Sequence, residues 1–466
     1  MAKTLFDKIW DSHVITDLGN GFVLLHIDRL LLHDLSGARA LQEAVEKGYT
    51  PAQPRLIYGT PDHAISTAPG RTEKTFPPGE PLIRNMRAAT AKYGIRLFDL
   101  GQDGNGIVHI IGPELALTLP GTTLICGDSH TCTHGGMGAL AFGVGSSELV
   151  HALATQTMVQ RKPKRLRVHF EGKMPPGRDA QGHDPASDRR CRHGGRHRPC
   201  RRVCRLARSG ACRSRDGSRS AISRSRWARA PAWWRPTTST FDYLNGRDFA
   251  PKGAMWDRAV AHWRTLPSDP DAEFDREHTI DMSKVAPQIT WGTSPEHVIA
   301  VDRPIPDPTT GPEDKRAAWT AALQYQGLEP GKPIEGTKVD WVFIGSCTNS
   351  RISDLRAAAA VAKGRHKAAH VHGLDRAGLG AREARGRGRG PRPACSATPA
   401  SNGASPAARC ASPPTASACR RASAASRPPT ATSSAARAPA RAPISPARRW
   451  PRAAAIKGAI ADVRKL

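Results

Sequence analysis

Residues 342–351 read VFIGSCTNSR, an apolar run that leads into a polar turn. The run from Val339 to Ile344 predicts a short buried β-strand. Gly345 permits a tight bend, which would place Cys347 just beyond the end of that strand. A thiolate in such a position can ligate a metal or act as a nucleophile. A lone cysteine beside a polar turn is also common as a buried free thiol, so this segment alone leaves both interpretations open.

A second polar loop is found at residues 127–138, GDSHTCTHGGMG. It follows the apolar run Thr123 to Cys126 and precedes ALAFGVGSSE at 139–148, which predicts a strand, a loop and a glycine-rich helix entry. Such a turn gathers hydroxyl groups, imidazoles and backbone N–H groups around one concavity, as a carboxylate ligand requires. The candidate side chains in it are Asp128, Ser129 and His130.

Three more histidines stand next to acidic or apolar segments. Asp62 precedes His63, and an adjacent carboxylate can set the tautomer of an imidazole. His33 is followed by Asp34, and His109 ends the run GIVH. Each of these histidines taken alone is more often structural than functional.

Taken together, these segments resemble a known family. GSCTNSR closely resembles the first cluster-cysteine motif of the aconitase and isopropylmalate isomerase superfamily. The order and spacing of the histidine segments resemble the large subunits of 3-isopropylmalate dehydratases, as do TFDYL at 240–244 and ITWGTSP at 289–295. The resemblance implies an aconitase-like α/β fold, with three α/β domains around a central iron–sulfur site. A fourth, swivelling domain would be supplied by a separate small subunit.

The alternation of apolar runs and helical patterns independently favours an α/β class with mainly parallel sheets. Residues 150–160 and 316–325 are expected to be helical. The N-terminus has no apolar core of a signal peptide, and no run approaches the length of a membrane helix. We therefore expect a cytoplasmic protein, in which cysteines serve as reduced thiols or metal ligands.

Two stretches depart from the family pattern. The resemblance covers residues 1–177, 241–364 and 455–466, and it fails over 178–240 and 365–454. Residues 178–237 hold 17 Arg, no Lys and 4 Asp, a net charge of +13, and residues 365–452 carry +15. These two charges account for the whole net charge of +28. Seven of the ten cysteines also lie there, so we expect both stretches to be irregular.

The genetic code offers an explanation for these stretches. Joining the last base of each codon to the first two bases of the next makes Trp227-Ala228 read Gly and Trp233-Trp234 read Val. When the codons of residues 225–238 are read in this shifted frame, they permit an amino-acid sequence that resembles the family's glutamate-bearing active-site segment. In the same shifted frame, the codons of residues 397–413 permit a sequence that contains Cys-Ser-Met-Cys, the motif of the family's second and third cluster cysteines. The codons of residues 428–438 permit a sequence that resembles the family's arginine loop. We interpret both stretches as family sequence translated out of frame, and the alternative is genuine basic inserts.

The resemblance implies a hydro-lyase that interconverts 2-isopropylmalate and 3-isopropylmalate by dehydration and rehydration in leucine biosynthesis. Hydroxide is a poor leaving group, and a Lewis-acidic iron of a 4Fe–4S cluster held by three thiolates would assist its departure. The residues that match family positions are listed by implied role: acid/base or hydroxyl-binding His63, Asp62, His130, Asp128 and Ser129; substrate-binding His33, His109 and Arg351; metal-ligating Cys347 and, weakly, Cys410.

One cluster cysteine stands in the expected frame, because residue 407 is Ala407 and Cys410 lies near the third thiolate position only by accident of frame. The chain as written is therefore expected to be inactive. Two alternatives stay open: a homoaconitase-like or other hydro-lyase of the superfamily, and a non-enzymatic basic protein that binds RNA on a dehydratase scaffold.

Overall fold

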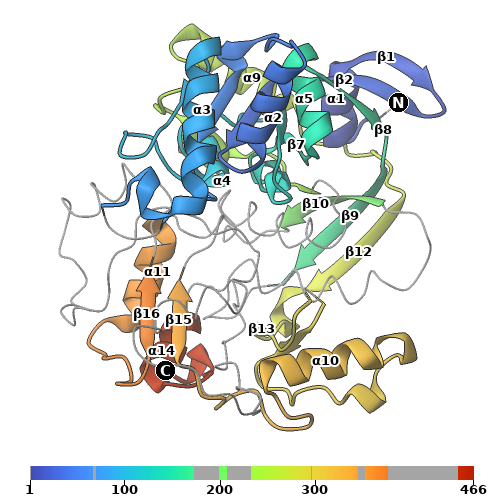
Figure 1. Ribbon diagram of the computed structural model, residues 1–466. Helices are drawn as coiled ribbons and strands as arrows, with labels where there is room; N and C mark the ends of the chain where they lie inside the picture. The colour runs from blue at the N-terminus through green and yellow to red at the C-terminus, as the bar shows by residue number, and fades with distance from the viewer. Residues whose placement is uncertain are drawn as a thin grey trace.

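The computed structural model describes residues 2–66, 70–172, 199–206, 232–294, 296–344, 352–375 and 450–466. Figure 1 shows helices α2, α3, α5 and α9 in the upper part of the molecule, and β13, α10, β15, β16 and α14 in the lower part. No helix in the described ranges has both the length and the apolar character needed to cross a bilayer.

A parallel five-stranded sheet forms the centre of the upper part. Its spatial order is β5-β4-β3-β6-β7, and every neighbouring pair is parallel. The strands are β5 (Arg96–Leu97), β4 (Ile57–Thr60), β3 (Arg29–His33), β6 (Thr123–Cys126) and β7 (Leu140–Gly143). The chain builds β4 and β5 on one side of β3 and then crosses to the other side for β6 and β7. The strand order therefore reverses between β3 and β6, where open parallel sheets form a crevice at their carboxyl edge.

Both faces of this sheet are covered by apolar side chains. Leu30 and Leu32 of β3 pack into one core cluster, which also holds Leu41 of helix α2 (Ser36–Glu46) and Leu153 of helix α5 (Ser146–Thr155). Leu31 points the other way, into a cluster with residues of helix α4 (Val108–Glu114). Successive strand residues face opposite sides, so a continuous apolar run such as Leu30 to Leu32 suits a strand buried on both faces.

An N-terminal unit packs beside the central sheet. Helix α1 (Leu5–His13) begins at Thr4, whose side chain exchanges hydrogen bonds with Asp7 in a capping box. A three-stranded antiparallel sheet follows in the order β1-β2-β8, formed by β1 (Val14–Gly19), β2 (Phe22–His26) and β8 (Thr157–Arg161). Helix α5 thus ends at Thr155 and β8 replaces the second half of the helix expected over 150–160. That expectation was wrong there, since Thr157, Val159 and the left-handed Gln156 favour a turn into a strand.

A second parallel sheet has the order β11-β10-β9-β12. Its strands are β9 (Lys164–Glu171), β10 (Pro199–Leu206), β11 (Ala232–Trp233) and β12 (Arg276–Asp281). Strand β10 contradicts the expectation that all of residues 178–237 is irregular. Strand pairing uses backbone N–H and C=O groups that nearly every residue carries, so an atypical side-chain sequence can still supply a strand.

The lower part holds a separate apolar cluster that includes Trp291, Ile299, Leu323 and Val371. Its elements are β13 (Gln288–Thr290), β14 (Val298–Ala300), α10 (Arg316–Gln326), β15 (Trp341–Ile344), α11 (Ile352–Ala362), β16 (His372–Asp375) and α14 (Trp450–Lys457). Ala454 and Ala455 join this cluster, and Ala459 pairs with Lys338. The C-terminal residues therefore pack against the segment that precedes residue 376.

Three further helices and several short 3-10 turns complete the described elements. They are α3 (Glu80–Tyr93), α8 (Thr238–Leu244) and α9 (Ala254–Thr265), with short 3-10 turns η1 (Pro54–Leu56), η2 (Glu73–Thr75), η3 (Pro77–Gly79), η4 (Thr131–Met137), η6 (Met282–Lys284), η7 (Pro308–Thr310), η8 (Glu313–Lys315) and η9 (Val463–Lys465). Trp233 of β11 and Trp263 of α9 belong to the same core cluster as α1. Residues after 231 thereby complete the core that the first 172 residues begin.

Candidate active site

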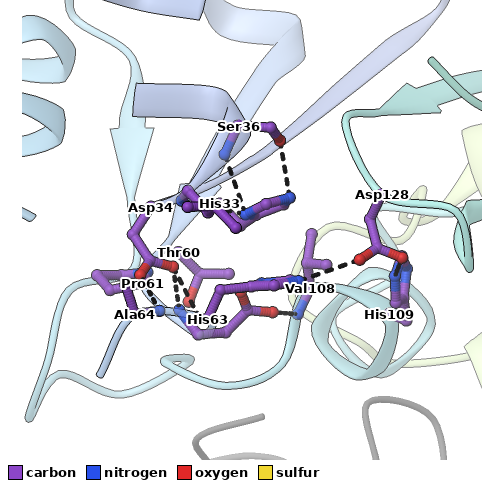
Figure 2. Close-up of polar contacts among 12 residues, drawn as sticks. His33, Asp34, Ser36, Thr60, Pro61, His63, Ala64, Val108, His109 and Asp128 are labelled. Carbon is purple, nitrogen blue, oxygen red and sulfur yellow. Dashed lines mark hydrogen bonds and ion pairs between the residues drawn. The ribbon is translucent and has the colours of Figure 1, made fainter. Parts of the chain in front are cut away.

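The candidate side chains gather at the carboxyl edge of the central sheet, next to its reversal point (Figure 2). His33 and Asp34 end and follow β3, Asp62 and His63 come after β4, and Asp128 comes after β6. His109 lies in the first turn of α4. Carboxyl ends of parallel strands meet at one edge, which explains how residues up to 95 positions apart in the chain become neighbours.

Asp128 is the centre of the group. One of its oxygens, Oδ2, lies 3.0 Å from His63 Nε2, and the other, Oδ1, lies 2.9 Å from His109 Nε2. Oδ1 also accepts a 2.6 Å hydrogen bond from the backbone N–H of His130 and lies 3.2 Å from its Nδ1. A carboxylate only accepts hydrogen bonds, so it orients all three imidazoles with an N–H towards itself.

His63 is held from both sides. Its Nδ1 contacts Asp62 Oδ1, and the other oxygen of Asp62 accepts a 2.8 Å hydrogen bond from the Val108 backbone N–H. The ring of His33 stacks on that of His63 with centroids 3.8 Å apart. The adjacent Asp62–His63 pair expected from the sequence is therefore present, although the second carboxylate partner, Asp128, comes from a distant segment.

His33 and Asp34 have different surroundings from His63. His33 Nδ1 accepts a 3.2 Å hydrogen bond from the Leu35 N–H, and its Nε2 lies 2.8 Å from Ser36 Oγ. Asp34 Oδ1 accepts 2.8 Å hydrogen bonds from the backbone N–H groups of both Asp62 and His63. Asp34 thus fixes the turn after β4, a structural role that sequence spacing did not indicate.

The two stacked imidazoles differ in protonation. Burial alone would lower the pKa of His63, but the charge of Asp62 and the hydrogen bonds with Asp128 and Asp62 raise it well above its usual value. Burial and the neighbouring charge of His63 lower the pKa of His33. Near neutral pH the pair therefore consists of a charged His63 and a neutral His33. Both nitrogens of His63 contact carboxylate oxygens, whereas Nδ1 of His33 accepts a hydrogen bond from the Leu35 N–H.

The pKa of Asp128 shows how strongly the site favours its anion. Burial opposes ionisation, but the electrostatic interaction and hydrogen bond with His109, together with the hydrogen bonds of His130 and His63, hold the pKa of Asp128 far below the usual range. Asp128 is consequently a permanent negative charge between three imidazoles.

Other predicted residues have different placements. Ser129 is exposed and follows Asp128, whereas the side chain of His130 is buried. Cys347, Arg351 and Cys410 lie outside the described residues, so their proposed roles remain predictions. His134 and Thr118, which sequence analysis did not single out, are buried next to His109. The one sequence signal for His134 was its place in the loop at 127–138.

Within the part of the chain that the structure describes, two groups have donor atoms close enough to hold a metal ion, each within 4.8 Å: His33, Asp34, Asp62 and His63, and His109, Asp128 and His130. Their nitrogens and oxygens already pair with one another, and Asp34 is occupied by backbone N–H groups. Among the cysteines whose side chains the structure describes, Cys126 and Cys132 are both buried and form no disulfide. Burial, with the charge of Asp128, raises the pKa of the Cys126 thiol well above its usual value, which disfavours thiolate ligation.

Paired imidazoles and carboxylates at the carboxyl edge of a parallel sheet define an α/β enzyme that moves protons on a bound ligand. Comparison with known proteins identifies the family. The model of the aconitase family (aconitate hydratase) matches residues 7–182 and 228–378, and the chain belongs to this family.

Two relatives are similar over most of their length. The 3-isopropylmalate dehydratase large subunit 1 of Bradyrhizobium diazoefficiens is 51% identical over 387 residues, covering 79% of this chain and 77% of the relative. The 3-isopropylmalate dehydratase large subunit of Roseiflexus castenholzii is 42% identical over 381 residues, covering 78% of each. The family match also reaches beyond the limits at 177, 241 and 364 that the sequence pattern had suggested.

Proposed function

We propose that this chain derives from the large subunit of a 3-isopropylmalate dehydratase, a hydro-lyase that interconverts 2- and 3-isopropylmalate in leucine biosynthesis. The observation that carries the proposal is the match to dehydratase large subunits, together with a family match whose first block, residues 7–182, contains the whole Asp128 cluster. Because those relatives are named large subunits, a small subunit is the expected partner, and the cytoplasm is the expected compartment.

The described residues supply the acid–base part of such a reaction. Dehydration requires a proton for the departing hydroxyl and a group that accepts a proton from carbon. His63, with its raised pKa, holds a proton at Nε2 near neutral pH, and Asp62 and Asp128 keep its ring in place. His109 and His130 present further imidazole nitrogens around the same carboxylate. These are the residues that we assign to substrate binding and proton transfer.

The thiolates of the chain as written do not fit a 4Fe–4S cluster. Three cysteine ligands are required to hold the cluster and leave one iron open. In the segments that resemble the family, Cys347 alone matches a cluster-cysteine motif. Cys126 and Cys132 are buried in the central domain, and the raised pKa of the Cys126 thiol opposes ligation. We infer that this polypeptide lacks the ligand set that its family relationship implies.

A double frameshift accounts for the missing ligands. The comparison covers nearly equal shares of both chains, 79% and 77%, which supports stretches that replace family sequence over stretches that lengthen the protein. The segments that flank each stretch pack together, as β9 with β12 and β15 with α14. Genuine inserts would add residues to a complete family sequence, whereas compensating frameshifts replace family sequence with an unrelated sequence of similar length.

Resequencing the gene from independent DNA tests this explanation. We expect compensating insertions or deletions near codons 177 and 240, and near codons 364 and 454. Restoring the frame should recover the Cys-Ser-Met-Cys text within codons 397–413. A single intact frame would contradict the frameshift and favour basic inserts that bind nucleic acid.

A substrate comparison distinguishes the dehydratase from a homoaconitase-like relative. The frame-restored large subunit, combined with its small subunit, should prefer 2-isopropylmalate to the tricarboxylate homocitrate by about a hundredfold in kcat/KM, because a site that accepts an isopropyl group disfavours the burial of a charged carboxyethyl group. The measurement is the initial rate with each substrate. The reverse preference would assign the chain to the homoaconitase-like class.

A further inference from the structure

His109 has a second imidazole behind it. His134, in the 3-10 turn η4, is fully buried, and its Nε2 lies 3.2 Å from His109 Nδ1. The other nitrogen of His134, Nδ1, lies 2.6 Å from the hydroxyl oxygen of Thr118, which is also fully buried. A continuous row of polar contacts therefore leads from Thr118 through His134 and His109 to Asp128.

Asp128, at the end of this row of contacts, influences which nitrogen carries the proton in His109 and in His134. Asp128 is ionised and only accepts, so its contact with His109 favours the form of that ring with a proton at Nε2. When each ring carries one proton, His109 Nδ1 is an acceptor and receives the N–H of His134 Nε2. His134 Nδ1 is then an acceptor as well, and the Thr118 hydroxyl donates to it. Each member thereby fixes the tautomer of the next.

The backbone leaves space for this arrangement at Gly112. A Cβ atom at Gly112 would lie 2.4 Å from His134 Cε1 and 2.8 Å from Thr118 Oγ1, closer than side chains tolerate. Gly112 and His109 are three residues apart on α4, so they share one face of the helix. Helix α4 thus holds His109 next to Asp128 and, at Gly112, leaves space for the ring of His134 that contacts His109.

We propose that His134 and Thr118 are positioning residues that lock His109 in the Nε2–H tautomer, and that Gly112 provides the room they need. The proposal rests on the proposed dehydratase function for its catalytic meaning, but the tautomer itself is a property of the chain. Without this support His109 would also sample the tautomer whose bare Nε2 faces the carboxylate of Asp128, and the geometry of the site would be lost.

Nitrogen NMR of the full chain as written measures the tautomers directly. Deuterated protein with 15N-labelled histidine would be examined near pH 7.5, and the signals of His109 and His134, among 18 histidines, would be assigned by their loss in His109→Gln and His134→Gln. We expect both rings to show a protonated Nε2 and a bare Nδ1. A proton on Nδ1 of His109 would overturn the proposal.

Variants at Thr118 test the origin of the lock. Thr118→Val keeps the shape but removes the hydroxyl, and it should give mixed tautomers at both His134 and His109, whereas Thr118→Ser should restore the single form. Thr90→Val is the matched control, since the buried Thr90 hydroxyl donates to the Met86 carbonyl within α3. Gly112→Ala should displace His134 and produce the same mixture. Unchanged tautomers in both Thr118→Val and Gly112→Ala would refute the role.

Kinetics separates this proposal from the function on which it rests. In the frame-restored enzyme, Thr118→Val should lower kcat about tenfold with little change in KM, which is the lower range for partners that orient a functional imidazole. Thr118→Ser should recover the rate. If the restored enzyme shows no dehydratase activity at all, the proposed function fails while the tautomer result still decides the positioning role.

Discussion

The chain as written, expressed with its small subunit and supplied with iron and sulfide, should show neither cluster absorbance nor turnover of isopropylmalate, whereas the frame-restored chain should show both. The reason is the number of ligands. Three thiolates fix three irons and leave the fourth for substrate, but Cys347, even with a contribution from Cys410, provides too few. The measurements are the visible absorbance of the reconstituted protein and the rate of isomerisation.

Two variants of the restored chain show which part of the site each residue serves. Cys347→Ser should abolish cluster absorbance and turnover together. His130→Ala should keep most of the absorbance but lower turnover about a hundredfold or more, because we assign His130 to proton transfer or substrate binding. Turnover by the chain as written at the rate of the restored enzyme would refute both the frameshift and the requirement for three thiolates.

Replacing Asp128 by asparagine should give the second large effect. Asp128→Asn removes the charge that three imidazoles share and turns an amide group towards their N–H donors. Removing one partner of a buried ion pair costs about 3–5 kcal/mol of unfolding free energy. Turnover of the restored enzyme should fall by about 10²-fold or more, since His63 and His109 lose their orientation.

The destabilisation should depend on pH in a defined direction. The raised pKa of His63 means that its pairing stabilises the fold fully below about pH 6.5 and weakens as pH rises through that raised pKa. The lowered pKa of Asp128 means that its contribution is present above about pH 4 and declines only as pH falls towards its depressed value. The loss in Asp128→Asn should thus be largest between about pH 4 and 6.5.

Urea unfolding of the restored chain at several pH values provides the measurement. Asp307→Asn is a matched control, because Asp307 is exposed and caps η7 through the Thr309 N–H, a role that asparagine performs equally well. The control should change stability by less than about 0.5 kcal/mol. A loss in Asp128→Asn as small as that of the control would show that the cluster is not held by the Asp128 charge.

The sequence by itself determined which segments belong to the functional edge. The run Thr123 to Cys126 predicted a strand, and the polar loop after it predicted candidate site residues. The charge and cysteine content of residues 178–237 and 365–452 distinguished them from the rest of the chain. These properties are visible because periodicity, composition and reading frame are local along the chain.

Tertiary structure alone decided which groups meet. His63 and Asp128 are 65 residues apart, and they touch because β4 and β6 lie on either side of β3 with their carboxyl ends at one edge. The same packing gives Asp34 a structural role and places His134 behind His109, and backbone pairing makes a strand of β10 despite its atypical sequence. Contacts between strand ends depend on the order of strands in the sheet and on close packing at Gly112, and neither is written in the spacing of residues along the chain.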